Sequence, residues 1–357
     1  MKTPSDMESF SSHAVRLSVR EWLVVLLIVA VVWIALPVIG EKLESFKADA
    51  DFRIPYPSSE DYRLFERFCR SVGCQDKTFV IGDSFVWGQF VPKDQTLTHH
   101  LNEQAGIKRY VNLGLDGGHP LALAGLIEYY GGGIQNKNVI LHLNLMWLCS
   151  PEADLQTLKG IRFNHPRLAP QFVPRIPGYQ ESFSRRIGIV LERHISLFGW
   201  VRHLNIAHFG GLGLPAWSLA NPYAPFFGQT TAEPSENQEV EPPGPQSWKA
   251  RGQNRQNLPW VDRKSSWQWQ AFKRLIAILE ARKNRVFILV GPLNEHMLEA
   301  ESLSKYKNLL KNIDAWLKDN NHPHFTAPLL PSDLYGDLSH PLGPGYVILA
   351  RQLGPFL

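Results

Sequence analysis

Short apolar segments alternate with helix-like segments along most of the chain after residue 78. Strands are expected at 79–81, 110–112, 139–145 and 285–290. Helices are expected at 96–104, 121–130, 267–281 and 300–318, with a final helix from about Pro344. This alternation predicts an α/β fold, a three-layer arrangement in which helices cover both faces of a parallel sheet. In such folds ligand sites lie at the carboxyl ends of the strands.

Residues 151–262 interrupt the alternation with many prolines and aromatic residues, and we interpret them as one long insertion above the sheet. Within it, 230–257 is rich in Glu, Pro, Gln, Asn and Gly, which predicts a mobile loop. Residues 184–209 carry apolar side chains at helical spacing and four arginines, which predicts one basic amphipathic helix. Such a helix either contacts a membrane or membrane partner, or packs on its own domain.

The run from Trp22 to Gly40 contains 19 uncharged residues, enough to cross a bilayer as a helix of about 1.5 Å rise per residue. A cleaved signal peptide is the alternative, but the run is long for one, and the small-x-small site Ala48-Asp49-Ala50 lies well beyond it. The expected organisation is therefore a tail at 1–20, a transmembrane anchor at 21–40, a stalk and first helix at 41–77, and the α/β domain at 78–357, which contains the insertion at 151–262.

Lysine and arginine counts near the anchor are equal on its two sides, so they do not set its orientation. A short N-terminal tail with Arg20 at the membrane edge is typical of a signal anchor. We therefore expect a single-pass membrane protein whose domain lies outside the cytoplasm, on the periplasmic side of a cell that has one.

A net charge of +4 comes without any block of basic residues interleaved with aromatics, which argues against nucleic acid as a partner. Two interpretations of the three cysteines stay open. Cys69 and Cys74 are close enough for a small disulfide loop, or all three cysteines are buried as free thiols.

Two short motifs carry the chemistry. Gly82-Asp83-Ser84 follows the first strand, and Asp337 stands three residues before His340. A serine hydroxyl becomes a nucleophile when an imidazole takes its proton and a carboxylate orients that imidazole. Asp337 and His340 would share a face in a helical turn, whereas the rival acid Asp333 would need a particular loop path. Asp83 is expected to stabilise the nucleophile turn.

The motifs resemble those of the SGNH (GDSL) hydrolase superfamily, an α/β fold with a nucleophile in a Gly-Asp-Ser block and a closing Asp-x-x-His block. Gly88 fits the first block, and Asn112 followed five residues later by Gly117 fits the second. The third block departs from the family, because Asn144 follows its strand without the usual small residues.

The resemblance implies Ser84 as nucleophile, His340 as base and Asp337 as the orienting acid. It assigns the oxyanion hole to Gly117, the Ser84 amide and Asn144. An α/β-hydrolase is excluded, because its nucleophile elbow requires Gly-x-Ser-x-Gly and position 86 is Val.

Membrane-anchored members of the superfamily in bacterial envelopes transfer acyl groups, commonly acetyl, to polysaccharides. They often act beside a multi-spanning membrane-bound O-acyltransferase (MBOAT) protein. The resemblance therefore implies an acyltransferase with a polysaccharide or other acyl acceptor. The alternatives are an envelope esterase, lipase or thioesterase, and a non-catalytic assembly or binding protein.

No cofactor is expected, and no metal site, because the spacing of His99, His100, His119 and His142 matches no zinc signature. Trp87 and Trp147 follow the first and third blocks and are candidates for stacking on sugar rings, with core packing as the alternative.

Overall fold

A computed structural model describes residues 17–44, 46, 48–157, 163–224 and 246–357. The chain forms two compact units, Met1–Ser45 and Phe46–Leu357. The second unit contains the sheet, the core and every residue of the expected site.

The first unit contains helix α1 (Val19–Leu43). Its first turn is closed by a capping box, in which the Ser18 hydroxyl accepts from the Glu21 amide and the Glu21 carboxylate accepts from the Ser18 amide. The helix has a mean hydropathy of 3.0 and is long enough to cross a membrane. It fits a single-pass anchor, although a signal sequence near the N-terminus meets the same criteria.

Five parallel strands form the sheet of the second unit in the order β2-β1-β3-β4-β5. They are β1 (Thr78–Gly82), β2 (Tyr110–Gly114), β3 (Asn138–Leu143), β4 (Arg285–Val290) and β5 (His324–Thr326). The predicted α/β class with an all-parallel sheet is confirmed. Strand β5 was not predicted, because three residues are too few to show a period.

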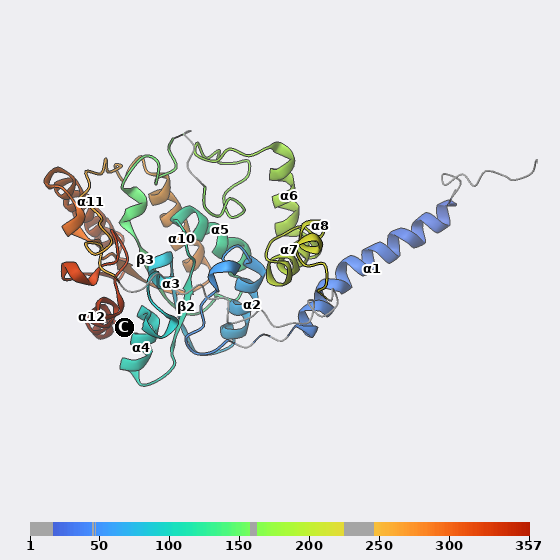
Figure 1. Ribbon diagram of the computed structural model, residues 1–357, viewed down its shortest axis with the longest axis horizontal. Coiled ribbons are helices and arrows are strands. Elements are labelled where there is room, and N and C mark those ends of the chain that lie inside the picture. The colour runs from blue at the N-terminus through green and yellow to red at the C-terminus, as the bar shows by residue number, and fades with distance from the viewer. Residues whose placement is uncertain (1–16, 45, 47, 158–162, 225–245) are drawn as a thin grey trace, which may run out of the picture. The chain divides into compact units, whose positions relative to one another are not determined.

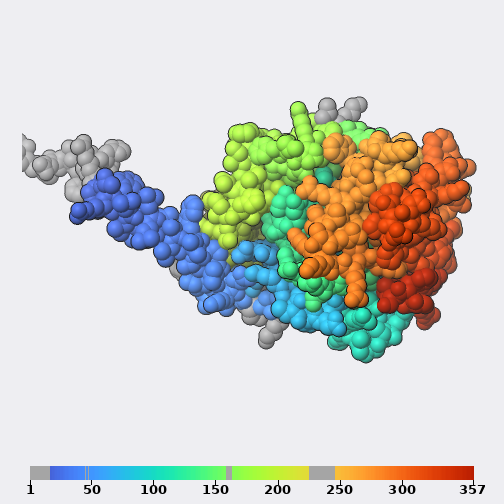
Figure 2. Space-filling view, turned by 180° about the vertical axis from the view of Figure 1, so that it is seen from behind, coloured from blue at the N-terminus to red at the C-terminus, as the bar shows by residue number. Residues whose placement is uncertain are grey.

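Helices cover both faces of the sheet (Figure 1). The helices are α2 (Tyr62–Gly73), α4 (Leu97–Ala105), α5 (Pro120–Tyr130), α10 (Trp267–Ala281), α11 (Ala300–Asp319) and α12 (Gly343–Leu353). The connection from β1 to β2 crosses the sheet in one direction, and all later connections cross it in the other direction. Because connections between parallel strands are right-handed, α4 lies on one face of the sheet and α5, α10 and α11 lie on the other. Helix α12 packs beside α4, and α5 beside α10. From behind, α10 to α12 form the orange and red part of the surface (Figure 2).

The insertion contains α6 (Phe183–His194), α7 (Ser196–Phe209) and α8 (Leu214–Ala220). The prediction of one continuous helix is wrong, because Ile195 has an extended backbone that ends α6. Helix α7 is fixed to α2 through a 2.7 Å contact between His203 Nδ1 and Asp61 Oδ2, both buried. Apolar side chains such as Phe183 and Val201 nevertheless remain exposed.

Residues 230–245 of the predicted loop lie outside the described residues. The end of that segment packs on the domain: Trp248 is buried, and its Nε1 donates to the Ser332 carbonyl. All three cysteines are free thiols. No disulfide joins Cys69 and Cys74, and the alternative, burial of all three, holds for Cys69 but not for Cys74, which is exposed, or Cys149, which is half-buried.

Candidate active site

The turn at Asp83, which holds the predicted nucleophile Ser84 and is called the nucleophile turn below, joins β1 to the short helix α3 (Ser84–Trp87). Asp83 caps α3, because its Oδ1 accepts from the Phe85 amide at 3.1 Å. Gly114 at the end of β2 lets this turn approach the sheet. A Cβ on Gly114 would lie 2.2 Å from the Trp87 amide nitrogen, so only glycine fits there.

Ser84, His340 and Asp337, hereafter the triad, lie in one hydrogen-bonded line although Ser84 and His340 are 256 residues apart. His340 Nε2 is 2.8 Å from Ser84 Oγ. His340 Nδ1 is 2.8 Å from each carboxylate oxygen of Asp337. The structure thus places Asp337 against the imidazole, and the rival acid Asp333 lies in a separate 3-10 turn at Ser332–Leu334.

Asp337 and His340 meet in a loop, so the expected helical turn is wrong. The Asp337 carboxylate accepts from the backbone amides of Ser339 and His340, each at 2.9 Å. These two hydrogen bonds form a local turn, and the turn rather than a helix brings the side chains of Asp337 and His340 together. Asn294 fixes the loop from outside by donating its side-chain amide to the Asp337 carbonyl at 3.0 Å.

The protonation of the triad follows from its partners. The Asp337 carboxylate can only accept, so His340 Nδ1 carries a hydrogen, and in the neutral ring Nε2 presents a lone pair to the Ser84 hydroxyl. Burial by itself would raise the pKa of Asp337, but the facing His340 and the hydrogen bonds to the carboxylate outweigh it and hold that pKa below its usual value. Burial opposes charge on His340 as well, yet Asp337, with smaller contributions from Asp83 and Asp116, raises the pKa of His340 above its usual value.

Asp83 connects the nucleophile turn to the end of β3. Its Oδ2 accepts from Asn144 Nδ2 at 2.7 Å and from Trp147 Nε1 at 2.9 Å. His142 Nδ1 lies 3.3 Å from its other oxygen. Burial opposes ionisation of Asp83, but His142 and the other partners outweigh it, and the pKa of Asp83 is lowered. The predicted role of Asp83 in stabilising the turn is confirmed.

The predicted oxyanion donors come from three elements at this edge of the sheet. Gly117 follows β2 and has a positive φ of 66°. Asn144 follows β3 and gives one Nδ2 hydrogen to Asp83, which leaves the second hydrogen of the same amide. Among the described residues, no acceptor is paired with the backbone amides of Ser84 and Gly117. The insertion lies over Gly117, since a Cβ there would be 3.1 Å from Asn164 Nδ2.

The structural role of Arg53 was not predicted. Its buried Nη1 donates to the carbonyls of Trp87, Gly88 and Val91 at 2.9 to 3.1 Å. The guanidinium also stacks on the Trp87 ring at 3.9 Å. Trp87 is itself 5% exposed, so its proposed sugar stacking is wrong and the core interpretation holds. No pattern in the sequence links an arginine to carbonyls more than 30 residues away.

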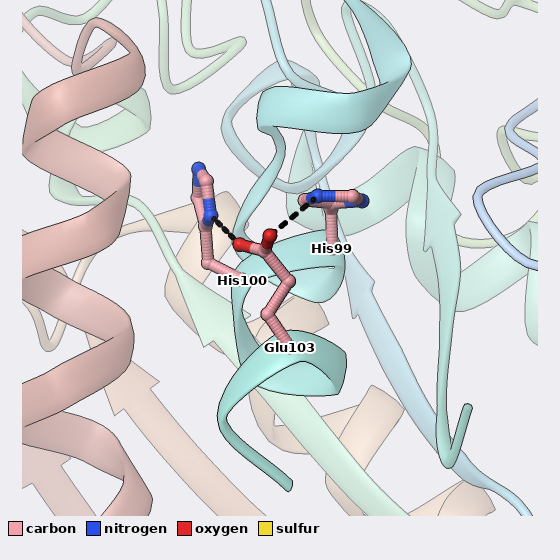
Figure 3. A group of neighbouring side chains, drawn as sticks. All are labelled: His99, His100 and Glu103. Atoms are coloured by element: carbon pink, nitrogen blue, oxygen red, sulfur yellow. Dashed lines mark hydrogen bonds and ion pairs between the residues drawn. The ribbon is translucent and has the colours of Figure 1, made fainter. Parts of the chain in front are cut away.

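His119 is a structural residue beside the site. Its Nε2 donates to the Asn164 carbonyl, and its Nδ1 accepts from the Ala122 amide as the cap of α5. Burial lowers the pKa of His119 to about 4, so the ring is neutral at pH 7. Among the described residues, one group combines three potential metal ligands, His99, His100 and Glu103 (Figure 3), and it lies on α4.

The strand order places the triad where α/β sheets bind ligands. The chain leaves β1 towards β2 and returns to β3 on the other side of β1, and the crevice at such a reversal lies at the carboxyl ends of these strands. Ser84 follows β1, and Asn144 follows β3. A 310 Å³ cavity lined by Thr78, Asn138 and Arg285 lies at the amino ends of the strands, on the opposite edge.

Comparison with protein-family models finds no match for this chain, and comparison with curated proteins finds none either.

Proposed function

We propose that this chain is a membrane-anchored serine acyltransferase of the SGNH type that acts on a cell-envelope polysaccharide. The observation that carries the proposal is the 2.8 Å contact between Ser84 Oγ and His340 Nε2, continued at 2.8 Å to Asp337. A non-catalytic protein has no need of a buried imidazole that faces a serine hydroxyl on one side and a carboxylate on the other, where the serine and histidine are only 5 and 6% exposed.

In the first half-reaction, Ser84 Oγ attacks the carbonyl carbon of an acyl ester and its proton moves to His340 Nε2. The carbonyl oxygen takes up negative charge, which the Ser84 and Gly117 amides and the remaining Asn144 hydrogen stabilise. Removing one such donor typically costs about 100- to 1000-fold in rate. The bond to the donor alcohol then breaks, the alcohol takes the proton from His340, and the acyl group remains on Ser84.

In the second half-reaction a sugar hydroxyl gives its proton to His340 and attacks the acyl carbon. The bond to Ser84 Oγ breaks and the serine recovers the proton. Asp337 holds the ring in place and stabilises its positive charge in both halves. The atoms balance without a cofactor.

The proposed setting is the outer side of a membrane, with α1 as the anchor and an MBOAT-type protein as the source of acyl groups. The capping and hydropathy of α1 support a membrane association. An esterase would use the same triad with water in place of the sugar.

The test uses the full chain in detergent, with a small aryl acetate as donor and an envelope-type oligosaccharide as acceptor. We expect release of the aryl alcohol to increase with acceptor, and acetylated oligosaccharide to appear by mass spectrometry. Release unaffected by the acceptor, with free acetate as the product, would establish the esterase instead. Release of the aryl alcohol by Ser84→Ala at the rate of the unaltered chain would refute both the acyltransferase and the esterase.

A further inference from the structure

Helix α4 presents His99, His100 and Glu103 around one point on the surface of the domain (Figure 3). Glu103 lies between the two imidazoles, with Oε2 2.8 Å from His100 Nδ1 and Oε1 3.5 Å from His99 Nε2. The three ligand atoms, one from each residue, all lie within 4.8 Å of one another.

His99 has a carboxylate at each ring nitrogen. Its Nδ1 is 3.0 Å from Oδ1 of Asp51, and its Nε2 faces Glu103. A neutral imidazole carries one N–H hydrogen, so one of these nitrogens would direct a lone pair at a carboxylate oxygen. A metal ion bound to Nε2, with the hydrogen on Nδ1 directed at Asp51, would satisfy both ring nitrogens at once.

We propose that His99, His100 and Glu103 bind a divalent transition metal ion such as Zn²⁺. Zinc binds imidazole nitrogen and carboxylate oxygen at about 2.0 to 2.2 Å, so its tetrahedral ligands lie roughly 3.3 Å apart. His100 Nδ1 is 2.8 Å from Glu103 Oε2 and His99 Nε2 is 3.5 Å from Glu103 Oε1, so each imidazole lies close to this spacing from one of the two carboxylate oxygens. Glu103 is 60% exposed and can adjust its position.

Asp51 completes the site from outside. A metal-bound histidine usually donates its other N–H to a carboxylate, which fixes the ring and strengthens it as a ligand. The contact between His99 Nδ1 and Asp51 has this geometry. For His100, Nε2 is buried and has no partner among the described residues, which leaves Nδ1 as the nitrogen that faces the site.

The metal fastens the segment around Asp51 to α4. This segment already pairs with the 3-10 turn before α4 through Asp49 and Lys93 at 2.7 Å, and it leads into Arg53 under the nucleophile turn. The sequence did not reveal the site because adjacent histidines followed by Glu103 match no zinc signature. The proposal is independent of the triad.

The experiment titrates Zn²⁺ into the full chain in detergent after chelator treatment, by calorimetry, with circular dichroism as the folding check. We expect one zinc per chain. His99→Ala and Glu103→Gln should each weaken binding more than tenfold, and Asp51→Asn should weaken it by about tenfold, the low end for an outer partner.

The matched control is His322→Ala, because His322 also faces one carboxylate, Glu280 at 3.4 Å, but has no part in a three-ligand group among the described residues. Its affinity for zinc should equal that of the unaltered chain. Absence of stoichiometric binding to the unaltered chain would overturn the proposal. Equal affinity in folded His99→Ala and Glu103→Gln chains would do the same.

Discussion

In the proposed mechanism Ser84, His340 and Asp337 act only together, because each sets the protonation that the next one needs. Asp337 sets the hydrogen on His340 Nδ1, and this hydrogen leaves Nε2 to accept from Ser84. The effects of substitutions in the triad should therefore overlap rather than add.

We expect His340→Ala to lower kcat for aryl acetate by at least about 10⁴-fold, nearly as much as Ser84→Ala. Asp337→Asn should also lower kcat severely, but its loss should be about 10- to 100-fold smaller than that of His340→Ala, since the imidazole stays in place without its orienting partner. The double variant Ser84→Ala with His340→Ala should match the single variants. Asp333→Asn is the control and should keep normal rates. Near-normal turnover by folded His340→Ala would show that His340 is not the catalytic base.

The pH dependence of kcat/KM should follow the ionisation of His340. The base acts in its neutral form, and Asp337 raises the pKa of His340 above its ordinary value of about 6.5. Activity should thus be low at acid pH and rise through a midpoint above about 6.5. In Asp337→Asn the carboxylate that raises this pKa is gone, so the residual activity should rise at lower pH. A midpoint that does not move would argue against the pairing.

Sequence spacing predicts contacts that form within a turn and not those formed across the fold. Asp337 and His340 were predictable as partners because three residues separate them, although their turn is not helical. Asp83 was expected to stabilise its own turn, but its bonds to Asn144 and Trp147 depend on where β3 ends beside β1. The role of Arg53 depends on the path of a whole segment, so nothing in the sequence around it could reveal it.

At the scale of elements, the approach of α3 to β2 decides where Ser84 lies. Asn112 in β2 donates its side-chain amide to the Val86 carbonyl at 2.8 Å, and Gly114 leaves room for the Trp87 backbone. The strands and helices were predictable from their alternation, since the buried parallel strands are short apolar runs. The break at Ile195 was not, because apolar spacing continues through it.

Gly114→Ala should displace α3, because the added Cβ would lie 2.2 Å from a backbone nitrogen that cannot swing aside. We expect a loss of unfolding free energy of about 1 to 3 kcal/mol together with a strong loss of activity. Gly132→Ala is the matched control, since no atom lies within 4 Å of a Cβ built there. Denaturant unfolding and aryl acetate turnover measure both effects. Equal stability and activity of the two variants would show that the space between α3 and β2 accommodates a Cβ at position 114.

At the scale of the whole molecule, the described residues of the unit Phe46–Leu357 contain the five-stranded sheet, one large hydrophobic core and a smaller apolar cluster around Tyr179. We therefore expect removal of residues 1–40 to yield a folded domain that remains in solution without detergent. Circular dichroism and size-exclusion chromatography check this. A truncated chain that is insoluble and has no folded fraction would show that the N-terminal residues take part in the fold.

The central claim is that Ser84 is a nucleophile activated by His340, and covalent labelling tests it most directly. The full chain is treated with a fluorophosphonate, which forms a bond to an activated serine oxygen with loss of fluoride, and the labelled peptide is identified by mass spectrometry. We expect one adduct, on Ser84, which forms far more slowly in His340→Ala and is absent in Ser84→Ala. An unlabelled Ser84 in the folded chain, or labelling of Ser84 at the same rate in His340→Ala, would contradict the account.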